Sequence, residues 1–150
     1  MVASYEIEIK GLKELTMRLE AAVKDDVIRK ALSKGTVLLA QWSIKNRFAT
    51  INPNRKQVLS DKLTARTAGG YRDRIFGQSP SEITKSGDAY IAKFGTNITN
   101  RGFSYPRLHE YGGIFHRPRP VLTPSIENTQ NRQQVIDILV SDINKALEKK

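Results

Sequence analysis

The chain has 150 residues, of which 39% are hydrophobic and 27% charged, so it is long enough for one packed domain and too apolar for wholesale disorder. It contains no cysteine, which excludes a disulfide framework, a thiol nucleophile and Cys-ligated zinc or iron–sulfur sites. Its 25 lysines and arginines against 15 acidic residues give a net charge of +10. This charge favours an acidic partner such as nucleic acid, an acidic protein surface or a lipid face. A basic surface that serves only solubility is the alternative explanation, and the charge alone does not exclude it.

The first half of the chain predicts a strand followed by helices. Apolar and charged residues alternate strictly over residues 5–10, the pattern of a strand with one buried face, and Gly11 ends it. Helical spacing follows at Leu12, Leu15 and Leu19. The sequence Lys24-Asp25-Asp26 then marks either a turn or an exposed part of a bent helix. A longer helix is predicted from an apolar stripe formed by Ile28, Ala31, Leu32, Leu39 and Trp42. It contains Gly35 and must end by Asn52-Pro53.

The segment 52–80 is polar, basic and rich in turn-forming residues. Its basic residues outnumber its acidic ones by four, and they are Arg55, Lys56, Lys62, Arg66, Arg72 and Arg74 against Asp61 and Asp73. We predict a long flexible loop here with one short helix at most, and such loops are often functional. Its charge would face DNA or an acidic partner.

The second half predicts a hairpin and two more helices. The hairpin turns at Ser86-Gly87-Asp88, and a short helix over residues 105–111 ends at Gly112-Gly113. The sequence Arg117-Pro118-Arg119-Pro120 must be extended, because a residue before proline avoids helical geometry. A last helix is expected from Thr123 as N-cap through an apolar stripe that ends at Leu147. The expected fold is one α+β domain over residues 1–150, with a long N-terminal helix and a C-terminal helix packed on a small antiparallel sheet.

Residues that would carry catalysis are sparse. His109 and Glu110 are adjacent, so on a helix their side chains diverge by about 100°, and no third ligand stands at helical spacing. We therefore interpret His109 as structural and expect no enzyme activity, no metal and no cofactor. The longest aliphatic run, residues 37–40, is far shorter than the ~20 residues of a spanning helix, and the first ten residues lack the pattern of a secretion signal, so we expect a protein that works without a membrane.

The segment from Tyr105 to Asn128 closely resembles the tail-completion and head–tail connector proteins of tailed bacteriophages, a group also called virion morphogenesis or minor tail proteins. The first half of the shared motif is matched by Tyr105, Leu108, His109, Glu110, Tyr111, Gly112 and Gly113. The second half is matched by Arg117, Pro118, Arg119, Pro120, Leu122, Pro124 and Ile126. The chain departs from the motif at Pro106, Val121 and Ser125. Residues 9–15 also resemble the family's opening strand and helix entry, whereas residues 67–75 match its middle segment only loosely.

This resemblance implies a structural protein of the virion neck or tail end, made in the host cytoplasm. Family members form rings, commonly hexameric, that finish the tail and join it to the DNA-filled head. The implied partners are other copies of the chain, the tail tube protein and the head-closure or connector proteins, with non-specific contact to DNA in the lumen. The residues expected at the subunit or partner interface are Tyr105, Leu108, His109, Glu110, Gly112, Gly113, Arg117, Pro118, Arg119 and Pro120.

Two other hypotheses stay open at this point. A basic nucleic-acid-binding protein would use the interleaved aromatic and basic residues Arg101, Phe103, Tyr105 and Arg107 together with the basic loop. A small nuclease or toxin would use His109 or His116. The first predicts binding that weakens steeply with salt.

Overall fold

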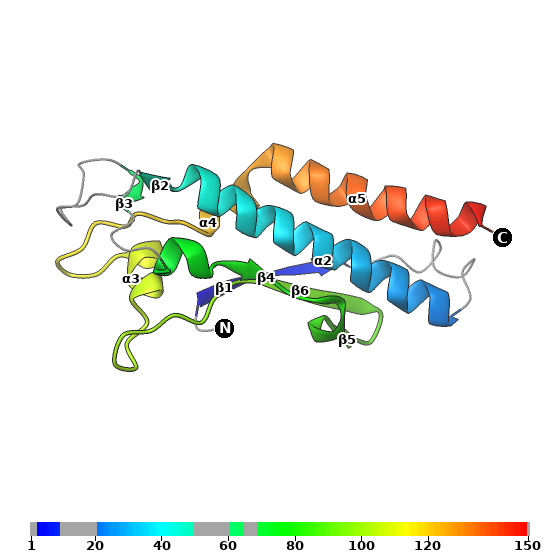
Figure 1. The fold of residues 1–150 in the computed structure, drawn as a ribbon, viewed down its shortest axis with the longest axis horizontal. Helices are drawn as coiled ribbons and strands as arrows, with labels where there is room; N and C mark the ends of the chain where they lie inside the picture. Colours follow the sequence, from blue (N-terminus) through cyan, green and yellow to red (C-terminus); the bar gives the residue numbers. More distant parts are fainter. Residues whose placement is uncertain (1–2, 10–20, 50–60, 65–68, 150) are drawn as a thin grey trace.

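A computed structural model describes residues 3–9, 21–49, 61–64 and 69–149. In it a small antiparallel sheet, the long helix α2 (Ala21–Asn46) and the C-terminal helix α5 (Thr129–Glu148) form three successive layers, with α2 in the middle (Figure 1). This confirms the predicted α+β fold with a long N-terminal helix and a C-terminal helix. The sequence 24–26 lies within α2, and the expected helix at residues 12–19 lies outside the described residues.

The sheet is built around its longest strand, β6 (Ala89–Thr96). One edge of β6 pairs with β1 (Ala3–Ile9), and the other pairs with β4 (Phe76–Gly77) and β5 (Thr84–Ser86). In β1 apolar and charged residues alternate, and in β6 every second residue (Tyr90, Ala92 and Phe94) is apolar and buried, so one face of the sheet packs toward α2. On the polar face Glu6 pairs with Lys93 across the strands, with 2.9 Å between the carboxylate and the ammonium.

Two glycines let α2 approach both of its neighbouring layers. A Cβ on Gly35 would lie 3.1 Å from a methyl group of Val135 in α5. A Cβ on Gly77 would lie 2.5 Å from the hydroxyl oxygen of Thr36 in α2, so β4 crosses the helix at backbone contact. A glycine inside a helix costs about 1 kcal/mol relative to alanine, and at Gly35 close packing against Val135 offsets this cost. The predicted stripe of α2 faces the core, where Ile28, Ala31, Leu32 and Leu39 are buried.

The prediction of a long flexible loop over residues 52–80 is wrong for the described part of that segment. Residues 61–64 contain β3 (Leu63–Thr64), which pairs in parallel with β2 (Phe48–Ala49). A 3₁₀ turn η1 (Tyr71–Arg74) then leads into β4, and a second turn η2 (Pro80–Glu82) follows. Tyr71 and Ile75 are buried, because they pack into the common core. Residues 52–60 and 65–68 lie outside the described residues.

The single C-terminal helix expected from Thr123 is also corrected, because the structure has two. A short helix α4 (Thr123–Glu127) is followed by a break at Asn128 and then by α5. Asn128 is extended, and its side chain accepts a hydrogen bond from the backbone N–H of Asn131 at 2.9 Å, so it caps α5. Asn131 also donates to the carbonyl of Ser125, which fixes the angle between the two helices.

Candidate subunit interface

The predicted interface residues lie in and just after α3 (Tyr105–Tyr111), near one end of the molecule's long axis (Figure 1). As expected, the helix ends at Gly112, whose φ of 74° is in the left-handed region that favours glycine. Its N–H donates to the carbonyl of Leu108 at 2.8 Å. A Cβ on Gly112 would lie 2.8 Å from the ring of Pro118 and 2.9 Å from the carbonyl oxygen of His116, so the chain returns directly over this glycine.

Between these residues the chain forms a two-residue hairpin that the sequence reasoning missed. The N–H of Gly113 donates to the carbonyl of His116 at 3.0 Å, and the N–H of His116 donates back at 3.1 Å. The tip consists of Ile114 and Phe115, which are 95% and 92% exposed. The sequence signal that could have indicated this exposed tip is the apolar pair directly after Gly112-Gly113. We call these two side chains the tip surface.

The arm that follows the hairpin, residues 117–120, belongs to no helix or strand, and it is tied back to α3 and to the residue after α2. The N–H of Arg119 donates to the carbonyl of His109 in α3 at 2.8 Å. The guanidinium of Arg47, just after α2, donates to the carbonyl of Pro120 at 3.0 Å. Arg117 and Pro118 are exposed between the tip and these anchors. The arm is therefore fixed at its base and presents a basic side chain beside the tip surface.

Glu110 is corrected from an interface residue to an internal one. It is 6% exposed, and its carboxylate accepts four hydrogen bonds from the start of the α4 region. One oxygen accepts from the backbone N–H groups of Val121 and Leu122, both at 2.7 Å. The other accepts from the N–H and the hydroxyl of Thr123, at 3.1 and 2.8 Å. This carboxylate, which we call the Glu110 latch, holds α3 against the chain that follows the arm.

Tyr105 and His109 also turn inward, into an aromatic cluster. The imidazole of His109 stacks on the ring of Tyr71, with centroids 6.3 Å apart and an interplanar angle of 16°. Tyr105 meets Tyr71 edge-on at 6.1 Å, and Phe48 does so from the other side at 5.5 Å. Burial raises the pKa of the Tyr71 phenol far above its ordinary value. The cluster ties α3 to η1 and β2, which supports the interpretation of His109 as structural.

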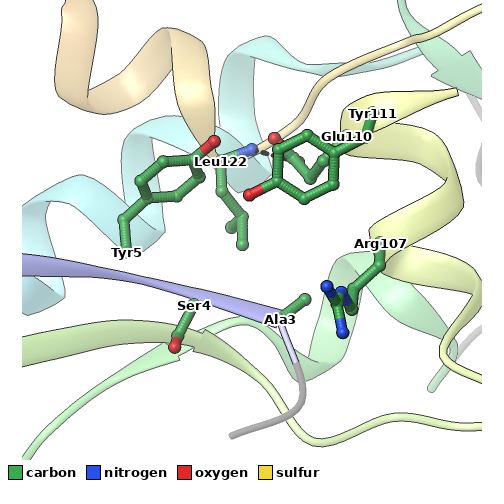
Figure 2. Close-up of a pocket in the computed structure, with 7 residues that line it drawn as sticks. All are labelled: Ala3, Ser4, Tyr5, Arg107, Glu110, Tyr111 and Leu122. Carbon is green, nitrogen blue, oxygen red and sulfur yellow. Dashed lines mark hydrogen bonds between the residues drawn. The ribbon is translucent and has the colours of Figure 1, made fainter.

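A pocket of about 190 Å³ lies between α3 and the start of β1. Figure 2 shows the rings of Tyr5 and Tyr111 beside it, with Arg107 nearer the first residues of β1. The Tyr5 hydroxyl is hydrogen-bonded to the hydroxyl of Thr123, and burial is the main cause that raises the pKa of Tyr5 to about 12. The Glu110 carboxylate lines the pocket, but its oxygens already accept from the α4 region. The guanidinium and the phenols suit an anionic group, such as a carboxylate on a partner.

The structure brings part of the predicted basic loop near α3. Burial raises the pKa of the Tyr105 phenol in α3, and the positive charge of the exposed Arg74 partly opposes that rise. Arg72 forms an ion pair with Asp73 at 3.0 Å. A backbone N–H from Gly69, and secondarily Arg72, lower the pKa of Asp73. Of the remaining predicted basic residues, Lys62 is exposed, and Arg55, Lys56 and Arg66 lie outside the described residues.

The residues proposed for nucleic-acid binding are separated by the fold. Asn100 and Phe103 exchange two backbone hydrogen bonds, at 3.0 and 2.9 Å, and close a second tight turn with Arg101 at its tip. Phe103 is 59% exposed, whereas Tyr105 packs into the aromatic cluster. Arg107 lines the pocket instead. The four residues thus do not form one stacking platform.

Within the described ranges, no group of three or more metal-ligating side chains comes together. The helices of the same ranges are too short or too polar to cross a bilayer. Comparisons with models of known protein families, with curated proteins and with solved structures gave no match for this chain.

Proposed function

We propose that the chain is a non-enzymatic structural protein of the neck or tail end of a tailed bacteriophage, where it forms a ring that joins the tail to the DNA-filled head. Two things support this proposal. The first is the resemblance of the segment from Tyr105 to Asn128 to tail-completion and connector proteins. The second is the tip surface, two bulky apolar side chains held out on a hairpin whose base is fixed from several directions.

The tip surface is the observation that carries the proposal. Soluble monomers rarely present bulky apolar side chains that are almost fully exposed on a projecting element, and such surfaces mark contacts with other proteins. The hairpin is also preorganised by Gly112, by the Glu110 latch and by the arm's hydrogen bonds, so little conformational entropy remains to be lost on association. A ring subunit needs such a contact, because each copy must meet two neighbours through different surfaces.

The second candidate function is binding of nucleic acid. The net charge of +10 and the exposed side chains of Arg101 and Phe103 at one tight turn favour it. It requires no ring and would act through phosphate contacts, so it predicts an affinity that falls steeply with salt.

Light scattering on nuclease-treated protein, with negative-stain images of the same peak, tests the proposal. We expect a closed ring of uniform mass. A monomer at every concentration that fails to attach to purified tail tubes, and that binds duplex or single-stranded DNA in a salt-sensitive way, would overturn the ring proposal in favour of the second candidate.

A further inference from the structure

A second exposed apolar surface lies along one side of α5, next to its buried face. Ile136 and Val140 are four residues apart, so they lie on one face of the helix, and they are 50% and 51% exposed. The adjoining face of α5 packs on α2 through the buried residues Val135, Leu139 and Ile143. We call Ile136 and Val140 the α5 face. Like the tip surface, it leaves apolar side chains of a well-ordered element in water.

The charges around the two surfaces are complementary. From Gly112 to Pro120 the tip segment carries two arginines and no carboxylate, a net charge of +2. From Thr129 to Glu148, α5 carries three carboxylates against two cations. One of the three, Asp142, is already paired with Lys34 of α2 at 2.6 Å. Asp137 is exposed directly beside the α5 face. The exposed Arg117 beside the tip surface is thus matched in charge by the exposed Asp137 beside the α5 face.

The two surfaces cannot cover one another within one molecule. The tip surface is more than nine-tenths exposed, so it touches almost nothing on its own chain. Helix α3, from which the hairpin extends, lies near one end of the long axis, and α5 lies in the layer beyond α2 (Figure 1). A contact between the tip surface and the α5 face therefore has to be made between two copies.

We propose that the tip surface of one copy docks on the α5 face of a second copy, with Arg117 beside Asp137. This inference deepens the proposed ring and rests on it. Because the two surfaces differ, the contact is head-to-tail, and a pair of copies keeps one free tip surface and one free α5 face for the next neighbours. Repetition of such a contact closes into a ring when its rotation allows. Ile114 and Phe115 supply the apolar anchors, and the surrounding charges fix the orientation.

The natural absence of cysteine makes disulfide trapping a clean test. Ile114→Cys protein is mixed with Val140→Cys protein under mild oxidation, so that Phe115 and Ile136 stay in place. We expect a covalent dimer from the mixture and a ladder of multimers from the double variant. The matched control replaces Val140→Cys by Asp88→Cys, at the exposed turn between β5 and β6, and should give background crosslinking only. Phe115→Asp, measured by sedimentation, should weaken self-association by about tenfold or more, as expected for loss of an apolar anchor.

Each other outcome contradicts either the docking contact or the ring. A mixed crosslink no stronger than the control overturns it. Crosslinking of Ile114→Cys with itself means that the tips meet each other. Loss of duplex-DNA binding in Phe115→Asp, without any mixed crosslink, means that the tip contacts nucleic acid. Rings that form without the mixed crosslink leave the proposed function standing and remove only this contact. A mixed crosslink that ends in a doubly linked dimer supports the contact and contradicts the ring.

Discussion

Replacing Glu110 by glutamine tests whether the Glu110 latch holds the base of the hairpin. The substitution keeps the shape of the side chain and replaces one acceptor oxygen by an NH₂ donor. In the native chain each carboxylate oxygen accepts two hydrogen bonds, from Val121 and Leu122 on one side and from Thr123 on the other. Glutamine can satisfy only one of these pairs, and the NH₂ group then faces donors.

The expected loss in the free energy of unfolding follows from the donor groups that Glu110→Gln leaves without an acceptor. If the amide oxygen keeps the Val121 and Leu122 bonds, the hydroxyl of Thr123 can rotate to accept from the NH₂ group, but the Thr123 N–H loses its acceptor. An unsatisfied buried donor costs about 1–3 kcal/mol, and the two remaining bonds lose their charge assistance. We therefore expect Glu110→Gln to lower the free energy of unfolding by about 2–4 kcal/mol, a large part of the usual stability of a domain.

Urea denaturation of the isolated chain, followed by circular dichroism, measures this loss. Glu148→Gln, at the exposed end of α5, is the matched control because it changes the net charge equally. The control should stay within about 0.5 kcal/mol of the native chain. If Glu110→Gln shifts the unfolding free energy no more than the control does, the latch is not a stabilising element and the account of the hairpin base is wrong.

Three further predictions concern single residues. In thermal melts, Gly112→Ala should destabilise the chain more than Gly102→Ala does. The two glycines have similar φ angles, 74° and 78°, but only at Gly112 would the new Cβ collide, at 2.8 Å from the ring of a proline. Equal effects of the two substitutions would contradict this steric explanation. In urea denaturation, Tyr71→Phe should leave the free energy of unfolding nearly unchanged, because within the described structure the buried Tyr71 hydroxyl has no hydrogen-bond partner. Tyr90→Phe should lower the free energy of unfolding by about 1–2 kcal/mol, because the Tyr90 hydroxyl donates to a carboxylate of α2. The pKa of Tyr5 in the folded chain, about 12, lies above its value of 10.0 in the unfolded chain. The stabilisation that comes from this difference is therefore complete below pH 10 and is lost as the pH rises through about 12. In Tyr5→Phe, the free energy of unfolding should fall less steeply over that pH range.

Elements with a long regular pattern could be predicted from the sequence. Strand β1 follows from the alternation that begins at Tyr5, and α5 follows from an apolar stripe that includes Val135 and Leu139. The short helix α3 was predictable because Gly112 ends it. In each case neighbouring residues alone carry the information, since the pattern depends on one helix or strand period.

The errors occur where burial depends on distant partners. Tyr71 stands in a basic segment with no apolar periodicity, and it is buried because Phe48 and His109 approach it from elsewhere in the chain. Glu110 is charged and sits on a short helix, which predicts exposure. Its acceptors are occupied by backbone donors that lie 11 to 13 residues later in the chain. Neither contact has a local signal.

The construction of the hairpin base argues that the tip surface is used. Around this short turn the chain has a left-handed glycine, a buried carboxylate with four donors and backbone hydrogen bonds from the arm. None of these constraints buries Ile114 or Phe115, which stay in water in the isolated chain. Burying two such side chains is worth about 1.5–3 kcal/mol each, so the gain is available only to a complex. A hairpin fixed in advance delivers that gain with little entropy loss, which is the property required of a subunit that must meet its neighbours in one fixed orientation.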